Sequence, residues 1–63
     1  MSKSKIERQG YQVRSGAPGW WVDGQFGYLV SGYWDTRDKA VAEATAVIEA
    51  AVASGRRPAW LFD

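Results

Sequence analysis

Residues 18–34 read PGWWVDGQFGYLVSGYW, a run that holds six of the nine aromatic side chains of this 63-residue chain and no lysine or arginine. A chain of this length forms one domain and buries only about 60% of the surface that its unfolded form exposes. The interior is therefore too small to hide the whole run. We expect one part of the run to form the core and another part to face a partner, because exposed apolar patches mark interaction sites.

The composition excludes several kinds of catalytic site. The chain has no cysteine and no histidine, which removes the usual zinc sites, iron–sulfur clusters and nucleophile–histidine pairs. Asp23 and Asp35 are each explained by a turn or a helix cap, so we do not pair them as catalytic carboxylates. The sequence predicts a protein that is not an enzyme, without a catalytic, cofactor-binding or metal site.

The same sequence predicts a cytoplasmic protein without membrane contact. The N-terminal stretch MSKSKIERQG has basic residues but no apolar segment behind them. No apolar run approaches the roughly 18 residues that a membrane-spanning helix needs. A chain without cysteine is also suited to a reducing compartment.

Three segments have the pattern of β-strands. Residues 11–14 (YQVR) alternate apolar and polar side chains, and SGAPG then breaks the chain. Asp23-Gly24 is a favoured pair for a two-residue type I′ hairpin turn, so we expect strands at residues 19–22 and 25–34. The alternative places the reversal near Phe26-Gly27 and gives a shorter third strand.

A helix is predicted over residues 38–54. Asp35 or Thr36 can cap its N-terminus, and Gly55 can take the left-handed conformation that ends a helix. Apolar residues recur at spacings of three and four, which predicts one apolar stripe. These residues are Ala40, Val41, Ala44, Val47, Ile48 and Ala51.

Together these elements predict an α+β fold of two layers. A three-stranded antiparallel meander sheet carries one C-terminal helix packed on one face. Residues 1–63 then form a single small β-β-β-α domain, with a flexible basic arm at residues 1–9 and a C-terminal tail at residues 56–63. The apolar residues of the tail are placed to cover an open end of the core.

The predicted hairpin sorts the aromatic run into two faces. A turn at Asp23-Gly24 pairs Val22 with Gln25. Side chains along each strand then alternate between the two faces of the sheet. The face predicted to meet the helix collects Trp21, Phe26, Tyr28, Val30 and Trp34. A bulge at Gly27 would exchange the faces of all later residues. The other face has no second helix to cover it, and its predicted binding residues are Gln12, Arg14, Trp20, Val22, Leu29, Ser31 and Tyr33.

An uncharged aromatic surface favours a protein partner, since charged residues are depleted in the cores of protein interfaces. We expect a small binding module that engages, inhibits or adapts another protein. The alternative is DNA or RNA binding, in which rings stack on bases while Lys3, Lys5 and Arg8 of the basic arm reach phosphates. A further alternative is homodimerisation through the same face.

The segment GYWDTRDKAVAEA, about a fifth of the chain, resembles the passage from third strand to helix in Apetala-type and integrase arm-type DNA-binding domains. The matching residues are Gly32, Trp34, Asp35, Thr36, Ala40 and Ala44. This resemblance implies three strands and a helix, with the uncovered sheet face entering the major groove. Only Arg14 stands where those domains carry arginines, and the lack of Lys and Arg from residues 15–36 departs from their pattern.

Overall fold

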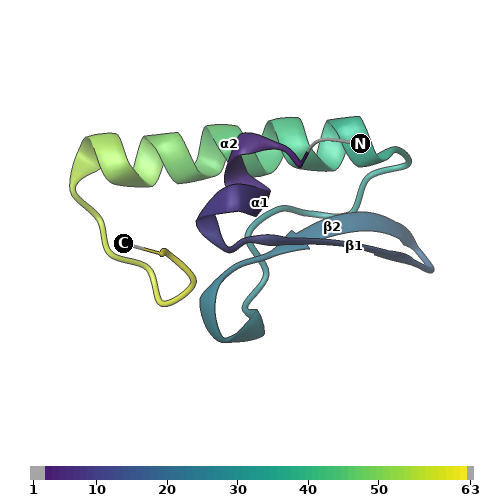
Figure 1. Ribbon diagram of the computed structural model, residues 1–63, viewed down its shortest axis with the longest axis horizontal. Helices are drawn as coiled ribbons and strands as arrows, with labels where there is room; N and C mark the ends of the chain where they lie inside the picture. Colours follow the sequence, from purple (N-terminus) through teal and green to yellow (C-terminus); the bar gives the residue numbers. More distant parts are fainter. Residues whose placement is uncertain (1–2, 63) are drawn as a thin grey trace.

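The structure, a computed structural model, describes residues 3–62 and combines a two-stranded antiparallel sheet with one long C-terminal helix. Figure 1 shows the long helix lying along one face of the hairpin, so the predicted α+β class with two layers is confirmed. Residues 1, 2 and 63, the ends of the predicted arm and tail, lie outside the described residues. The elements are α1 (Lys5–Gln9), β1 (Gln12–Gly16), β2 (Gly19–Asp23), the 3-10 turn η1 (Gln25–Gly27) and α2 (Arg37–Ser54).

Helix α2 follows the sequence signals closely. It begins one residue before the predicted start, and the hydroxyl of Thr36 caps it by accepting a hydrogen bond from the Lys39 amide at 3.2 Å. Gly55, with φ of 75°, ends it in the left-handed conformation. The residues that α2 buries are Ala40, Ala44, Ile48 and Ala51. Three of these four are alanines, which let the helix lie close to the sheet.

The hairpin turn lies at Ala17-Pro18, a cis peptide bond, and not at Asp23-Gly24. Strands β1 and β2 pair so that Val13 lies opposite Val22 and Gly16 lies opposite Gly19. Gly24 is extended, with φ of −103°, so the predicted type I′ turn is wrong. Packing requires glycine after this turn, because a Cβ atom on Gly19 would lie 2.3 Å from the Trp34 carbonyl oxygen.

The structure does not show the predicted third strand among residues 3–62. The chain reverses at η1, where the alternative placed the reversal, and residues 28–34 return beside β2 with only two isolated bridges. Trp20 and Trp34 exchange two backbone hydrogen bonds of 2.7 and 2.8 Å, and the Val30 amide donates to the Val22 carbonyl at 2.9 Å. The ladder is not continuous between these contacts, so the segment is a loop that follows β2.

The core is mainly aliphatic, and the predicted aromatic core is wrong. Phe26, Tyr28 and Trp34 are 77%, 54% and 36% exposed. The predicted turn paired Val22 with Gln25, whereas the structure places Val30 beside Val22 and turns Trp20, not Trp21, toward the core. Phe26 lies in the turn η1, and residues 28–34 form no continuous strand with alternating faces. The buried apolar residues are Ile6, Tyr11, Val22, Val30, Ala40, Ala44, Ile48, Ala51 and Leu61. Trp60 and Phe62 of the tail pack against this core, as predicted.

Residues 5–9 form a packed helix, which corrects the predicted flexible arm. The side chains of Ser4 and Glu7 make a capping box, in which the Ser4 amide donates to the Glu7 carboxylate at 2.9 Å. Ile6 is only 2% exposed and belongs to the core. Arg37 at the start of α2 forms an ion pair with Glu7, so α1 is tied to both the core and the long helix.

Candidate functional site

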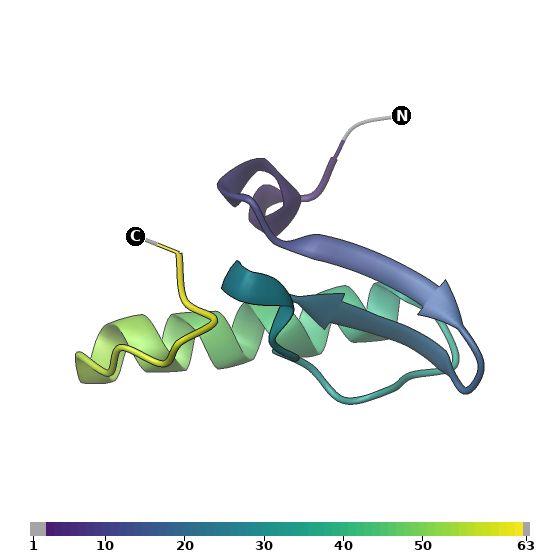
Figure 2. The same cartoon turned by 90° about the horizontal axis from the view of Figure 1, so that it is seen from below.

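One face of the hairpin points away from α2, and we call it the outer face. Val13 and Val22 lie on the opposite face and pack in or against the core, so the residues on either side of each valine point outward. Leu29 forms a bridge with Asp23, which extends this face into the returning loop. Figure 2 shows the hairpin from the side opposite α2. The outer face consists of Gln12, Arg14, Trp21, Asp23, Leu29 and Tyr33.

Two aromatic rings form the apolar part of the outer face. The ring centroids of Trp21 and Tyr33 are 5.3 Å apart at an interplanar angle of 67°, an edge-to-face geometry that aromatic pairs prefer. Tyr33 is 54% exposed and Trp21 is half-buried. The Trp21 indole lies over Gly16, at ordinary contact distance (3.6 Å) from where a Cβ atom would stand. The pair thus presents apolar surface while its rings hold each other in place.

The polar part of the outer face is electrically balanced. The Arg14 guanidinium donates a hydrogen bond of 2.6 Å to the Asp23 carboxylate and another to the Gln12 side-chain oxygen. The Arg14 side chain is 49% exposed and that of Asp23 only 14%. An exposed ion pair of this kind contributes little to stability, about 0–1 kcal/mol. The ion pair does link the Arg14 side chain on β1 to Asp23 on β2. It also neutralises Arg14, the one cation of the outer face.

The structure brings four of the seven predicted binding residues together on the outer face, namely Gln12, Arg14, Leu29 and Tyr33. The other three lie elsewhere: the hairpin register turns Trp20 and Val22 toward the core, and Ser31 lies in the loop after η1. Val22 is fully buried, and Trp20 packs against the core. Ser31 is 2% exposed, and its hydroxyl accepts a hydrogen bond from the Val22 amide at 3.0 Å, which is a structural role.

Trp21 and Asp23 are the outer-face residues that sequence reasoning missed. In a strand, neighbouring side chains point to opposite faces, so Trp20 and Trp21 cannot both be core residues. The sequence signal for the correct register was the pair of glycines, Gly16 and Gly19, that flank Ala17-Pro18. Pairing Gly16 with Gly19 places Trp21 opposite Arg14, as observed.

The predicted nucleic-acid arm does not extend over the outer face. Lys5 lines a groove between α1 and α2, on the other side of the sheet. The Arg8 side chain folds back and donates to the Lys3 carbonyl at 3.4 Å. Lys3 itself lines a polar hollow beside Gln12 and is the member of the arm that comes nearest the outer face.

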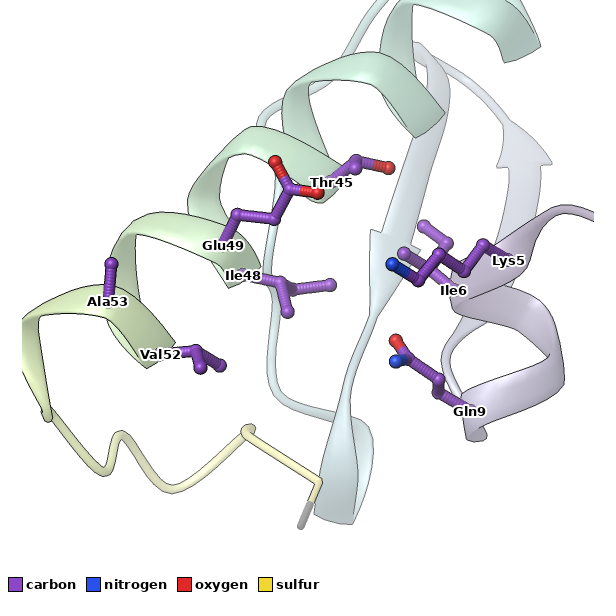
Figure 3. Close-up of a pocket in the computed structure, with 8 residues that line it drawn as sticks. All are labelled: Lys5, Ile6, Gln9, Thr45, Ile48, Glu49, Val52 and Ala53. Carbon is purple, nitrogen blue, oxygen red and sulfur yellow. The ribbon is translucent and has the colours of Figure 1, made fainter.

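An apolar groove of about 270 Å³ lies between α1 and α2 (Figure 3). Ile6 and Ile48 line it, and Lys5 and Glu49 lie on opposite walls. The Thr45 hydroxyl donates to a backbone carbonyl of its own helix at 2.8 Å.

Over residues 3–62, no group of acidic side chains could hold a metal ion, and neither helix has the length and apolarity of a membrane span. No protein-family model matches the chain, and no curated protein or solved structure matches it. The resemblance of the GYWDTRDKAVAEA segment to Apetala-type and integrase arm-type domains stays a prediction. The candidate site is thus defined by the outer face and by the exposed residues that adjoin it.

Proposed function

We propose that this protein is a non-enzymatic binding module that engages another protein through the outer face and the loop beside it. One observation carries the proposal: the large apolar side chains that the described chain exposes are concentrated in one segment. Five of the six lie between residues 26 and 34, and the sixth is Val52 on α2. A concentrated apolar surface on a small protein is typical of an interaction site. The five are Phe26, Tyr28, Leu29, Tyr33 and Trp34.

Electrostatics supports a protein partner over a nucleic acid. Residues 15–36 contain no lysine or arginine, and the Asp23 carboxylate already neutralises Arg14. Nucleic-acid affinity depends on cations that contact phosphates and release counterions. Protein interfaces instead favour aromatic residues and arginine, and the outer face carries Trp21, Tyr33 and an Arg14 that Asp23 neutralises.

Capture experiments with matched variants test the proposal. The immobilised wild-type protein, Tyr33→Ala and Val52→Ala would be exposed to an extract of the source organism, and retained proteins would be quantified by mass spectrometry. We expect one retained protein whose affinity falls about 30-fold in Tyr33→Ala, the loss typical of an interface hot spot of about 2 kcal/mol. Val52→Ala, exposed on the other layer, should bind like wild type. Equal retention by all three proteins would contradict the proposal.

Two further measurements decide between this function and its alternatives. In a mobility-shift titration at two salt concentrations, tight and salt-sensitive binding to duplex DNA or single-stranded RNA that is lost in Arg14→Ala would favour a nucleic-acid module. In sedimentation equilibrium, a dimer that Tyr33→Ala dissociates would assign the outer face to self-association. A protein partner requires a negative result in both measurements.

A further inference from the structure

Phe26 has two properties that the fold itself does not require. It is the only described residue other than glycine with a positive φ, at φ of 62° and ψ of 16°. A bulky side chain is strained in this left-handed region, which glycine adopts freely. The ring is also 77% exposed, more than any other large apolar side chain described. Neither backbone conformation nor core packing therefore explains a phenylalanine at this position.

The turn that carries Phe26 is fixed from both sides. The Gln25 amide donates to the Trp60 carbonyl at 2.7 Å, and the Gly24 amide donates to the Tyr28 carbonyl at 2.8 Å. A Cβ atom on Gly24 would lie 2.3 Å from the Trp60 carbonyl oxygen, so the turn lies directly against the C-terminal tail. Strained residues persist where their surroundings over-determine them, and they cluster at functional sites.

The turn displays the ring at the periphery of the molecule. Figure 1 shows η1 projecting from the side away from α2, beside the C-terminal segment. The rings of Phe26 and Tyr28 lie in an edge contact, with centroids 6.4 Å apart. Residues 24–34 contain no charged side chain. The charges that adjoin this segment, Arg14 and Asp23, neutralise each other. An apolar phenyl ring fits an uncharged apolar pocket, and the turn offers no cation for a phosphate or an anionic lipid headgroup.

We propose that Phe26 is the anchor of the protein interface, with its ring inserted into an uncharged apolar pocket of the partner. This inference rests on the proposed function and names the residue on which affinity depends most. Tyr28 and Leu29, which are 54% and 45% exposed, contact the rim of that pocket. Because hydrogen bonds already fix the backbone of the turn, binding orders little of the main chain, and such preorganisation raises affinity.

Site-specific cross-linking tests the anchor directly. The photoreactive residue p-benzoylphenylalanine would replace Phe26, Tyr33 or, as a control, Val52, and each protein would be irradiated in an extract of the source organism. We expect positions 26 and 33 to form an adduct with the same protein and position 52 to form none. That protein would then be purified and titrated with the wild-type chain and Phe26→Gly. Phe26→Gly should bind at least 30-fold more weakly and melt at or above the wild-type temperature, since glycine relieves the strain.

Each failure has a separate meaning. An adduct at position 33 without one at position 26, together with unchanged affinity of Phe26→Gly, would overturn the anchor and leave the proposed function in place. The absence of adducts at both positions would overturn both. An adduct between two copies of this chain would replace the protein partner by self-association. A Phe26→Gly protein that unfolds at lower temperature would show that the ring has a structural role, which contradicts the inference.

Discussion

The Tyr11 hydroxyl accepts a hydrogen bond at 3.0 Å from the backbone amide of Phe62, a residue 51 positions later in the chain. The two rings also make an edge-to-face contact, with centroids 4.8 Å apart at 86°. Tyr11 is 3% exposed, and Leu61 beside Phe62 is 6% exposed. This contact joins the residue before β1 to the C-terminal tail and closes the end of the core that α2 leaves open.

Tyr11→Phe is expected to destabilise the protein by about 1–3 kcal/mol, because the Phe62 amide loses its acceptor in a partly buried site. A change of this size lowers the melting temperature by about 4–8 °C per kcal/mol in a chain of this length. Thermal unfolding followed by circular dichroism measures it. Tyr33→Phe, whose ring is 54% exposed, is the matched control and should stay within about 0.5 kcal/mol of wild type. Equal losses in both variants would argue against the Tyr11–Phe62 contact.

A methyl group added at Gly24 should separate η1 from the tail. Its Cβ atom would lie 2.3 Å from the Trp60 carbonyl oxygen and 2.9 Å from a Val30 methyl carbon. We expect Gly24→Ala to cost about 1–3 kcal/mol through overpacking, measured by urea unfolding. In Gly32→Ala the nearest atom, a Glu43 carboxylate oxygen, lies at an ordinary 3.6 Å, and stability should change little. Similar stability of the two variants would show that the turn and the tail are not packed as described.

The sequence predicts α2 well because all of its signals are local. Thr36 as the cap, apolar residues at spacings of three and four, and Gly55 as the terminator all lie within the helix or at its ends. Helix α1 has a local signal too, in Ser4 and Glu7 at capping-box spacing, but five residues are too few for an apolar period to appear. A helix this short depends on tertiary packing, here the burial of Ile6, which the sequence alone does not reveal.

The faces of the aromatic run could not be predicted, because they depend on register. Asp23-Gly24 has the stronger hairpin propensity, but the fold uses Ala17-Pro18, where the Trp34 backbone packs against Gly19. A change of one residue in pairing moves every following side chain to the opposite face. In the observed register Trp21, and not Trp20, shares the outer face with Gln12, Arg14, Leu29 and Tyr33.

Acid should weaken the attachment of α1. Hydrogen bonds from the Ser4 backbone and side chain, and the Arg37 guanidinium, lower the pKa of Glu7 from 4.5 to about 2. A carboxyl whose pKa is lower in the folded state stabilises the fold fully above pH 4.5, and this contribution is lost as the pH falls toward 2. The difference in unfolding free energy between wild type and Glu7→Gln should be constant above pH 5 and shrink toward zero near pH 2. Urea unfolding at five pH values measures it.

Salt provides the control for this pH effect. Added salt screens the attraction between Glu7 and Arg37 but leaves the Ser4 hydrogen bonds, which are the larger cause of the shift. We therefore expect 0.5 M salt, about five times the ionic strength at which the Debye length is 10 Å, to reduce the difference without abolishing it. Parallel pH profiles for wild type and Glu7→Gln would contradict the role of this carboxylate.

The close approach of α2 to the sheet should depend on the small size of Ala44. This residue is fully buried, whereas Ala46, two positions later, is exposed. Leucine has nearly the helix propensity of alanine, so Ala44→Leu and Ala46→Leu differ mainly in packing. Ala44→Leu should cost about 1–3 kcal/mol because the larger side chain displaces α2 from β2, and Ala46→Leu should stay within about 0.5 kcal/mol. Thermal unfolding of the pair measures this difference, and equal stability would mean that α2 presents another face to the sheet.

Because the outer face lies on the opposite side of the hairpin, folded Ala44→Leu should bind the partner as wild type does.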